Sequence, residues 1–542
     1  MSVKVKRWDH AASDTGRCVL FPAGLDRYYP PVYNRVQKGN GVFGFSQGRL
    51  FSLDRAGQKK QTGGKAAERI RRAKPEKEET MSERAETQQK SAPVSLRDIL
   101  AVDAAKAVHA AEHLLGRQGT ALPGKAALTI APSVLQDLAG QVRKTTFAVC
   151  GTNGKTTVNN LLCAFLEAEG QTVVCNRLGA NMLNGIAAAF AEAADHTGKL
   201  EAAYACLEVD EASALRVFAY VRPDYLILTN LFRDQLDRYG EIDLMMEKLE
   251  AAIRQVPDLK LIINADDPLS VYLAQKSGHP YCCYGISEPT QDGEQTHAKE
   301  VREGRFCKNC GALLAYEFYH YSQMGVWRCP QCGFSRPDPV HTADGILHEN
   351  GLTFYADGQP VRTGMRGLYT VYNILAVISA LAEDGHAGKE ELFQTVLDRY
   401  QPQFGRSERF RIGRSCVLLN LAKNPAGFNQ NIAAVLEDRS PKDLIIAIND
   451  NEQDGTDVSW LWDVDFDRMR DESIRSVTVS GIRALDMQLR LKYVEIPSLV
   501  SENTEEAIAR KLEDGCGNLY VLVNYTAPFA AHRYLKKKEE EV

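Results

Sequence analysis

The sequence predicts an α/β protein in which two domains are each built on a mostly parallel sheet with helices on both faces. The chain has 542 residues, which is too long for one ordinary hydrophobic core. Short apolar runs alternate with segments of helical periodicity, a pattern typical of parallel sheets covered by helices. A cysteine-rich stretch interrupts this alternation, which restarts near residue 411. These observations predict a large domain, residues 95–410, with an inserted module at 303–337, and a smaller domain, residues 411–542.

The first 94 residues differ from the rest of the chain. Gly, Gln and Lys dominate stretches such as Gly57–Lys65, charged residues crowd Arg69–Glu79, and hydrophobic periodicity is weak. Such a composition buries too little apolar surface to fold, so we expect residues 1–94 to be a disordered extension. Met81 is a second candidate for the start of the protein, and the sequence leaves the choice between the two starts open.

Composition and charge set limits on function. Hydrophobic residues make up 44% and charged residues 25% of the chain, as in soluble globular proteins. The net charge of -5 gives no support for nucleic-acid binding by the whole protein. No apolar run reaches the roughly 18 residues of a membrane-spanning helix, and Met1–Asp14 lacks the apolar core of a signal peptide. We therefore expect a cytoplasmic protein. Four of its 13 cysteines are clustered, and the other nine are expected to be small buried side chains.

The large domain is expected to begin with two helices. In Ser95–Leu115 apolar residues recur at helical spacing, and Ser95 is a suitable N-cap. A second helix, Pro132–Val142, leads into a strand, Thr145–Cys150, a glycine loop and a helix, Val158–Gly170. The further strands expected are Thr172–Cys175, Ala203–Glu208, Tyr225–Thr229 and Leu259–Ile263. The further helices are Gly185–Ala194, Ile242–Gln255, Val371–Glu383 and Lys389–Tyr400.

The smaller domain shows the same alternation. Its expected strands are Val417–Leu421, Leu444–Ile448, Ser476–Val479 and Leu519–Val523. Helical patterns lie between them, including Ala484–Leu491 and Thr504–Leu512.

The glycine loop is the strongest functional signal. Backbone N–H groups of such a loop, at the positive end of the following helix, bind phosphate oxygens. A lysine in the position of Lys155 meets the β- and γ-phosphates, and a threonine hydroxyl there can coordinate Mg²⁺. Val149 stands where the full phosphate-loop pattern has its first glycine, so a chance Gly-Lys-Thr turn is the alternative. The flanking strand and helix favour a phosphate site made of Gly151, Thr152, Asn153, Gly154, Lys155, Thr156 and Thr157.

Polar segments follow three of the predicted strands. Glu208–Glu211 ends the strand Ala203–Glu208, and carboxylates at strand ends face the ligand crevice of a parallel sheet. Glu208 is therefore our candidate Mg²⁺ ligand, with a solvated acidic cap as the alternative. Asn230–Gly240 and Asn264–Pro268 follow two other strands and suit the edge of a nucleotide or metal site.

The inserted module carries two Cys-x-x-Cys pairs, separated by 18 residues. Two such pairs supply four thiolates for one tetrahedral Zn²⁺. Four thiolates leave no open position, so the predicted role of the zinc is structural. The ligands are Cys307, Cys310, Cys329 and Cys332.

The loop Asn449–Asp457 follows a buried strand and precedes Ser459, Trp460 and Trp462. Acidic groups beside aromatic residues favour a placed carboxylate. A solvated loop rich in Asx turns is the alternative, and the residues alone leave the choice open.

Taken together, these motifs resemble the Mur ligases, which activate a carboxylate as an acyl phosphate for attack by an amine. The similar segments in the ATPase domain are Gly151–Thr157, Asn230–Gly240, Asn264–Pro268, Tyr369–Ala376 and Gly405-Arg406. Ala422-Lys423-Asn424-Pro425 is similar to the Ala-His-Asn-Pro segment that opens the Mur C-terminal domain. The cysteine module, Asn420–Gly427 and the segment Asp454–Trp460 resemble the MurT branch. The resemblance covers roughly residues 96–530. It implies a P-loop ATPase domain of Mur-ligase type with an inserted zinc ribbon, and a smaller Rossmann-like α/β domain.

The resemblance implies a reaction and a partner. In this branch ATP phosphorylates the α-carboxylate of D-glutamate in the stem peptide of lipid II, and ammonia then gives D-isoglutamine. A GatD-type glutaminase releases that ammonia from glutamine. The sequence agrees, because it contains no Gly-x-Cys-x-Gly elbow of a glutaminase. About 50 residues separate Leu96 from the glycine loop, too few for the nucleotide-sugar domain of ordinary Mur ligases. We therefore expect a heterodimer that meets lipid II transiently at the inner face of the membrane, without a nucleic-acid partner.

By matching positions, the resemblance also implies residue roles. Lys155 neutralises the transferred γ-phosphate, while Thr156 and Glu208 hold Mg²⁺. Asn373 meets the adenine, and Arg406 clamps phosphate when the domains close. Asp457 is lent to the glutaminase, where it orients the catalytic histidine and completes a triad across the interface; Asp454 is the reserve candidate.

Two departures and two alternatives remain. Gln235 stands where many Mur ligases have a metal-binding histidine, which puts a second Mg²⁺ in doubt, and Lys423 replaces the usual histidine. One alternative is a stand-alone amino-acid ligase of Mur or folylpolyglutamate type. The other is a binding module with a vestigial ATPase, against which the intact Lys155, Thr156 and Glu208 argue.

Overall fold

The computed structural model describes residues 94–114, 120–233, 242–290, 303–348, 351–402 and 405–541. The predicted extension, apart from Val94, lies outside these ranges, as do Met81 and Gln235. Within them, no helix is both long enough and apolar enough to cross a membrane.

Three helices precede the first strand: α2 (Leu96–Leu114), α3 (Leu122–Ile130) and α4 (Val134–Ala139). Ser95 caps α2 as predicted, since its hydroxyl accepts the Asp98 N–H at 3.2 Å and its own N–H binds the Asp98 carboxylate at 3.0 Å. The predicted helix Pro132–Val142 was too long, because the backbone leaves the helix at Gly140. Helix α3 was not predicted; a proline and a glycine in its first turn obscure its pattern.

The large sheet has nine strands in the order β11-β10-β9-β6-β5-β4-β1-β3-β2. From β9 to β2 each strand is parallel to the next, which confirms the predicted parallel sheet, although β6 and β9 were not among the predicted strands. Strands β10 and β11 add an antiparallel edge that was not predicted either. The strands are β1 (Thr145–Cys150), β2 (Val173–Cys175), β3 (Tyr204–Glu208), β4 (Tyr225–Leu228), β5 (Lys260–Asn264), β6 (Tyr281–Ile286), β9 (His341–Leu347), β10 (Leu352–Ala356) and β11 (Gln359–Thr363).

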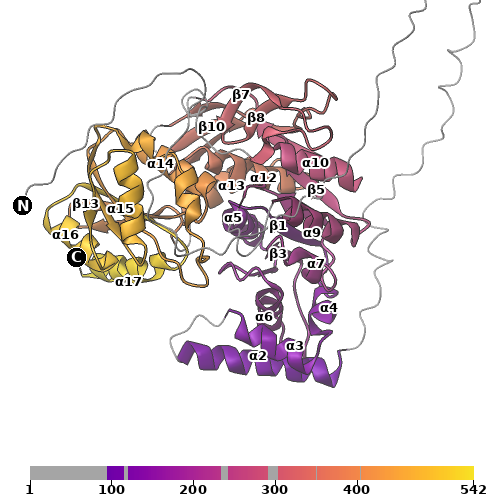
Figure 1. The fold of residues 1–542 in the computed structure, drawn as a ribbon. Helices are drawn as coiled ribbons and strands as arrows, with labels where there is room; N and C mark the ends of the chain where they lie inside the picture. Colours follow the sequence, from indigo (N-terminus) through magenta and orange to yellow (C-terminus); the bar gives the residue numbers. More distant parts are fainter. Residues whose placement is uncertain are drawn as a thin grey trace, which may run out of the picture. The chain divides into compact units, whose positions relative to one another are not determined.

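Helices cover both faces of this sheet (Figure 1). Alternate residues of β1 explain why: Phe147 and Val149 join the core beneath α5, α12 and α13, while Ala148 and Cys150 join the core on the opposite face. The helices are α5 (Lys155–Ala168), α6 (Leu183–Ala193), α7 (Ala214–Val217), α9 (Ile242–Arg254), α10 (Pro268–Ser277), α12 (Tyr369–Glu383) and α13 (Glu390–Arg399). Helix α5 begins three residues earlier than predicted, so that Lys155 and Thr156 lie in its first turn.

The inserted module is a small antiparallel hairpin of β7 (Ala315–Tyr321) and β8 (Met324–Arg328) preceded by a short 3-10 turn, η1 (Glu303–Arg305). Trp327 on β8 is 2% exposed and packs with Phe334 into the core of the large sheet. The module is therefore attached to the core of the large domain and is not held by its linkers alone.

A second sheet of six strands follows, in the order β12-β13-β17-β14-β15-β16. Only β12 is antiparallel to its neighbour. The strands are β12 (Glu408–Ile412), β13 (Ser415–Leu421), β14 (Lys442–Ala447), β15 (Ile474–Ser480), β16 (Leu499–Val500) and β17 (Asn518–Val523). The helices are α14 (Pro425–Glu437), η2 (Ser459–Asp463), η3 (Phe466–Met469), α15 (Ala484–Tyr493), α16 (Thr504–Glu513) and α17 (Ala527–Glu540). This confirms the predicted α/β class for both sheets, although α14 and α17 were not predicted.

Candidate active site

The glycine loop joins β1 to α5 and is fixed by bonds to the neighbouring strand end. The Thr152 N–H donates to the Asn230 carbonyl at 2.8 Å, and the Asn153 N–H donates to the Asn230 side chain at 2.9 Å. Gly154 has a positive φ of 90°, and a Cβ there would lie 2.2 Å from Asn373 Oδ1. The loop therefore needs glycine both for its backbone conformation and for the close approach of α12.

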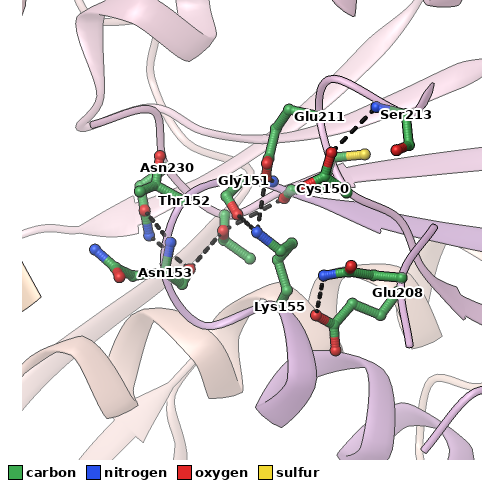
Figure 2. A network of polar contacts seen from close by, with 12 residues as sticks. Cys150, Gly151, Thr152, Asn153, Lys155, Glu208, Glu211, Ser213 and Asn230 are labelled. Carbon is green, nitrogen blue, oxygen red and sulfur yellow. Dashed lines mark hydrogen bonds and ion pairs between the residues drawn. The ribbon is translucent and has the colours of Figure 1, made fainter. Parts of the chain in front are cut away.

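Lys155 lies at the start of α5 with its side chain 7% exposed. Its ammonium donates to the Gly151 carbonyl at 2.6 Å and pairs with Glu211 at 3.0 Å (Figure 2). The same Glu211 oxygen accepts the Gly151 N–H at 2.6 Å. Burial raises the pKa of Glu211, and the Lys155 charge opposes that rise. The Glu211 carboxylate thus binds the Lys155 ammonium and the Gly151 N–H, two donors that a phosphate loop offers to a nucleotide.

Thr156 and Glu208 lie together beneath the loop, as predicted. The Thr156 hydroxyl donates to Glu208 Oε2 at 2.5 Å, and Asn181 donates to Glu208 Oε1 at 2.9 Å. Glu208 is 3% exposed and ends β3 at the edge of the sheet where the loop begins. A hydroxyl and a carboxylate are hard oxygen donors, so the pair fits a Mg²⁺ ion.

Asn373 lies against the phosphate loop, whereas Arg406 lies between the two sheets. Asn373 is 4% exposed on α12 and lies against Gly154. Arg406 is half-buried between α13 and β12. Burial raises the pKa of Tyr369, and the positive charge of Arg406 opposes that rise. Tyr369 begins α12 and its hydroxyl lies 3.3 Å from Ser407 Oγ. Arg406 therefore lies at the junction of the two sheets.

The two aspartates of the acidic loop have different surroundings. Asp454 is 3% exposed, and its carboxylate accepts the Thr526 N–H at 2.7 Å and the Asn451 amide at 3.2 Å. Asp457 is half-buried and accepts the Ser459 N–H at 2.8 Å. That bond lowers the pKa of Asp457, with smaller help from Arg233. Asp454 ties the loop to the start of α17, whereas Asp457 is the more exposed of the two aspartates.

The four ribbon cysteines come together as predicted. Their sulfur atoms all lie within 4.8 Å of one another, and two of the pairs are 3.5 Å apart. Four sulfurs at Zn–S distances of about 2.3 Å would be about 3.8 Å apart, so the group fits a tetrahedral Zn²⁺.

The ribbon is bonded to the polar segment after β5. Trp327 donates to the Ala265 carbonyl at 3.2 Å, and Gln323 donates to Asp267 at 2.7 Å. Arg336 pairs with the buried Asp266 at 2.5 Å. The predicted segment Asn264–Pro268 is thus held by the ribbon as well as by its own strand.

Several contacts join the large domain to the C-terminal sheet, and two of them involve segments that the sequence had singled out. The Asn424 amide, at the start of α14, donates to Asn153 Oδ1 on the phosphate loop at 3.1 Å. Arg233, which follows β4, pairs with Asp463 and lies 3.5 Å from Glu303 of the ribbon. The remainder of the predicted segment, residues 234–240, lies outside the described residues.

Sequence reasoning missed Glu211, Arg233 and the contact made by Asn424. Glu211 and Arg233 stand in segments that the sequence had singled out as polar, and Asn424 stands in the segment that resembles the start of the Mur C-terminal domain. Pattern alone gave no way to choose which polar side chain in each segment turns toward the loop.

Comparison with known proteins identifies the family. A model of the Mur ligase middle domain matches residues 149–326, and a model of the MurT ligase C-terminal region matches residues 421–528. The chain is 35% identical, over 80% of its length and 96% of the relative, to the MurT subunit of the glutamine-hydrolysing lipid II isoglutaminyl synthase of Staphylococcus aureus strain N315. The Streptococcus pneumoniae R6 subunit of the same description is 33% identical over 82% of this chain and 98% of its own.

Solved structures share the fold at lower identity. A pseudomurein peptide ligase type C from Methanothermus fervidus matches 74% of this chain and 81% of its own, with a TM-score of 0.57 and 20% identity. MurF from Acinetobacter baumannii matches 76% and 80%, with a TM-score of 0.54 and 14% identity. Folylpolyglutamate synthase from Mycobacterium tuberculosis matches 81% and 98%, with a TM-score of 0.51 and 16% identity. These likenesses concern the fold alone. The phosphate loop, the cysteine ribbon and the 33–35% identity over nearly the full length of two MurT subunits lead to one assignment: the chain belongs to the MurT family of ATP-dependent Mur ligases.

Proposed function

We propose that this chain is the ligase subunit of a lipid II isoglutaminyl synthase, which amidates the α-carboxylate of the D-glutamate in the stem peptide. The observation that carries the proposal is the built phosphate loop, with Lys155, Thr156 and Glu208 gathered around it. It stands in a chain that aligns over 96% of a curated subunit of that enzyme.

The chemistry would run in two steps. The substrate carboxylate attacks the γ-phosphorus of ATP, so that a P–O bond forms and ADP leaves. Ammonia then attacks the acyl phosphate, phosphate leaves, and the nitrogen loses a proton to give the amide. Lys155 would compensate the charge on the transferred phosphoryl group, and the loop N–H groups would hold the β-phosphate.

Two metals fit the residues present. Mg²⁺ would be held by Thr156 and Glu208, where it would supply positive charge beside the phosphates. Zn²⁺ would be held by the four ribbon cysteines in a structural role, because four thiolates leave no position for substrate. Asn373, against Gly154, and Arg406, at the junction of the sheets, are proposed to contact the nucleotide.

Ammonia is proposed to come from a GatD-type glutaminase bound as a second subunit. The S. aureus and S. pneumoniae relatives are both described as subunits of a glutamine-hydrolysing enzyme. Asp457 would orient the glutaminase histidine across the interface. Asp457 is half-buried, whereas Asp454 is 3% exposed and bonded to Thr526 at the start of α17, which supports the choice of Asp457. We further propose that the cytoplasmic complex reaches lipid II at the inner face of the membrane.

The decisive experiment measures ATP-dependent amidation of lipid II by mass shift. The purified chain is assayed with glutamine plus a GatD-type glutaminase, or with free ammonia. Asp457→Asn should lose at least tenfold with glutamine and keep its activity with ammonia, because only the glutaminase half-reaction needs that carboxylate. Lys155→Ala should lose at least a hundredfold with both nitrogen sources.

The control is Asp450→Asn, on the same loop, where Asp450 pairs with Arg483 at 3.3 Å. It should behave as wild type with both nitrogen sources. Product formed from an amino acid, with none from ammonia or glutamine, would instead establish a stand-alone ligase. Full activity of Lys155→Ala would remove the phosphate-site assignment.

A further inference from the structure

A second group of metal-binding side chains lies in the large sheet, away from the ribbon. The ligand atoms of Cys282, His341 and Glu383 lie within 4.8 Å of one another. Cys282 is the second residue of β6, His341 is the first residue of β9, and Glu383 is the last residue of α12. The starts of parallel strands share one edge of a sheet, so this group lies at the edge opposite to the phosphate loop.

The histidine of the group is oriented by a carboxylate. His341 Nδ1 lies 2.7 Å from Asp357 Oδ2, and the other Asp357 oxygen accepts the Thr342 N–H at 2.8 Å. The aspartate is thus fixed by the backbone and holds one ring nitrogen. This arrangement, in which a second carboxylate fixes the ring and leaves Nε2 for the ion, is typical of metal-bound histidines.

We propose that Cys282, His341 and Glu383 bind a thiophilic divalent cation of the Zn²⁺ class. A thiolate, an imidazole and a carboxylate suit such ions, and three protein ligands leave a fourth position for water. This site differs from the ribbon, whose four thiolates close the coordination sphere. It is independent of the ATP chemistry, since none of its residues belongs to the proposed active site.

A lysine competes with the ion. Lys260 on β5 pairs with Glu383, and its side chain is 37% exposed. In the metal-free protein this ammonium balances the carboxylate. A bound cation displaces it, and the Cys282 thiol releases its proton on binding. Removing the lysine charge should therefore strengthen metal binding, an effect that a purely structural cluster would not produce.

The test uses Co²⁺ as a probe, added to the full chain after the ribbon has been loaded with a single equivalent of Zn²⁺, which its four thiolates take up first. Zinc stays in the ribbon because it binds thiolates more tightly than cobalt does. Wild type should take up one Co²⁺ per chain with a thiolate-to-cobalt charge-transfer band. Cys282→Ser and His341→Gln should each lose that band, and Lys260→Met should lower the Co²⁺ Kd at least tenfold.

The control is Cys283→Ser, the neighbouring residue, whose thiol donates to the Asp338 carbonyl at 3.4 Å. It points to the opposite face of β6 and should leave the band intact. No band in wild type, or a band that survives in Cys282→Ser, would overturn the proposal. Unchanged affinity in Lys260→Met would overturn the competition between ion and ammonium.

Discussion

At the residue scale, the position of the Lys155 ammonium depends on one carboxylate, that of Glu211. Glu211 is 4% exposed and touches both the Lys155 ammonium and the Gly151 N–H. Burial raises its pKa, and the Lys155 charge opposes that rise. An incoming phosphate needs the same donors. Glu211→Gln should therefore tighten binding of an ATP analogue about fivefold, equivalent to about 1 kcal/mol. Without nucleotide it should lower the free energy of unfolding by about 3 kcal/mol, because Lys155 loses its buried counter-charge.

Calorimetric titration and thermal melting measure these two effects separately. Glu201→Gln is the matched control, because Glu201 pairs with Lys199 at 2.6 Å on the surface, where both side chains are more than half exposed. A surface pair contributes little, so this variant should bind and melt as wild type does. Weaker nucleotide binding by Glu211→Gln would mean that Glu211 positions Lys155 for phosphate instead of competing with it.

At the scale of elements, the ribbon acts as a support for the ATPase core. Its hairpin bonds to Ala265, Asp266 and Asp267, directly after β5. Removing zinc with a chelator should free the four thiolates, lower the melting temperature of the chain by several degrees and lower activity in parallel. Adding Zn²⁺ back should restore both. An unchanged melting curve with lost activity would show that the metal takes part in the chemistry.

At the scale of the whole molecule, Asn424 couples the phosphate loop to the C-terminal sheet. Its Oδ1 caps α14 by accepting the Gly427 N–H at 2.8 Å, while its Nδ2 donates to Asn153 at 3.1 Å. Asn424→Ala loses both contacts and should cost about 1 kcal/mol of stability from the cap. Asn424→Ser keeps a capping oxygen but loses the amide donor to the loop. Both variants should therefore weaken nucleotide binding severalfold, whereas Asn424→Ala alone should be clearly destabilised in a denaturant melt. Equal nucleotide affinity in wild type and Asn424→Ser would show that the contact does not couple the two parts.

Local signals account for what the sequence determined by itself. The strand Thr145–Cys150 was predicted with its observed bounds, since two threonines and four apolar residues form a short run that ends at a glycine. The four ribbon cysteines were paired correctly as one group because Cys-x-x-Cys spacing fixes which sulfurs can share an ion. Thr156 and Glu208 meet because a phosphate loop and a strand end share one edge of a parallel sheet.

Tertiary structure decided what periodicity cannot report. Glu208, Asp210 and Glu211 all follow the same strand, but only the folded chain shows Glu211 on Lys155, which lies 56 residues away. Asp454 and Asp457 look alike in sequence, and their burial separates them. Helix α14 was missed because it carries buried amides, and the edge strand β11 was missed because only Val361 and Thr363 of its five residues are buried. The sequence thus determined the strand, loop and helix of the phosphate site and the residue types that carry the chemistry. Long-range packing decided which side chains meet. Residues far apart in the sequence surround each carboxylate, and only their packing determines whether it is buried and which cation it reaches.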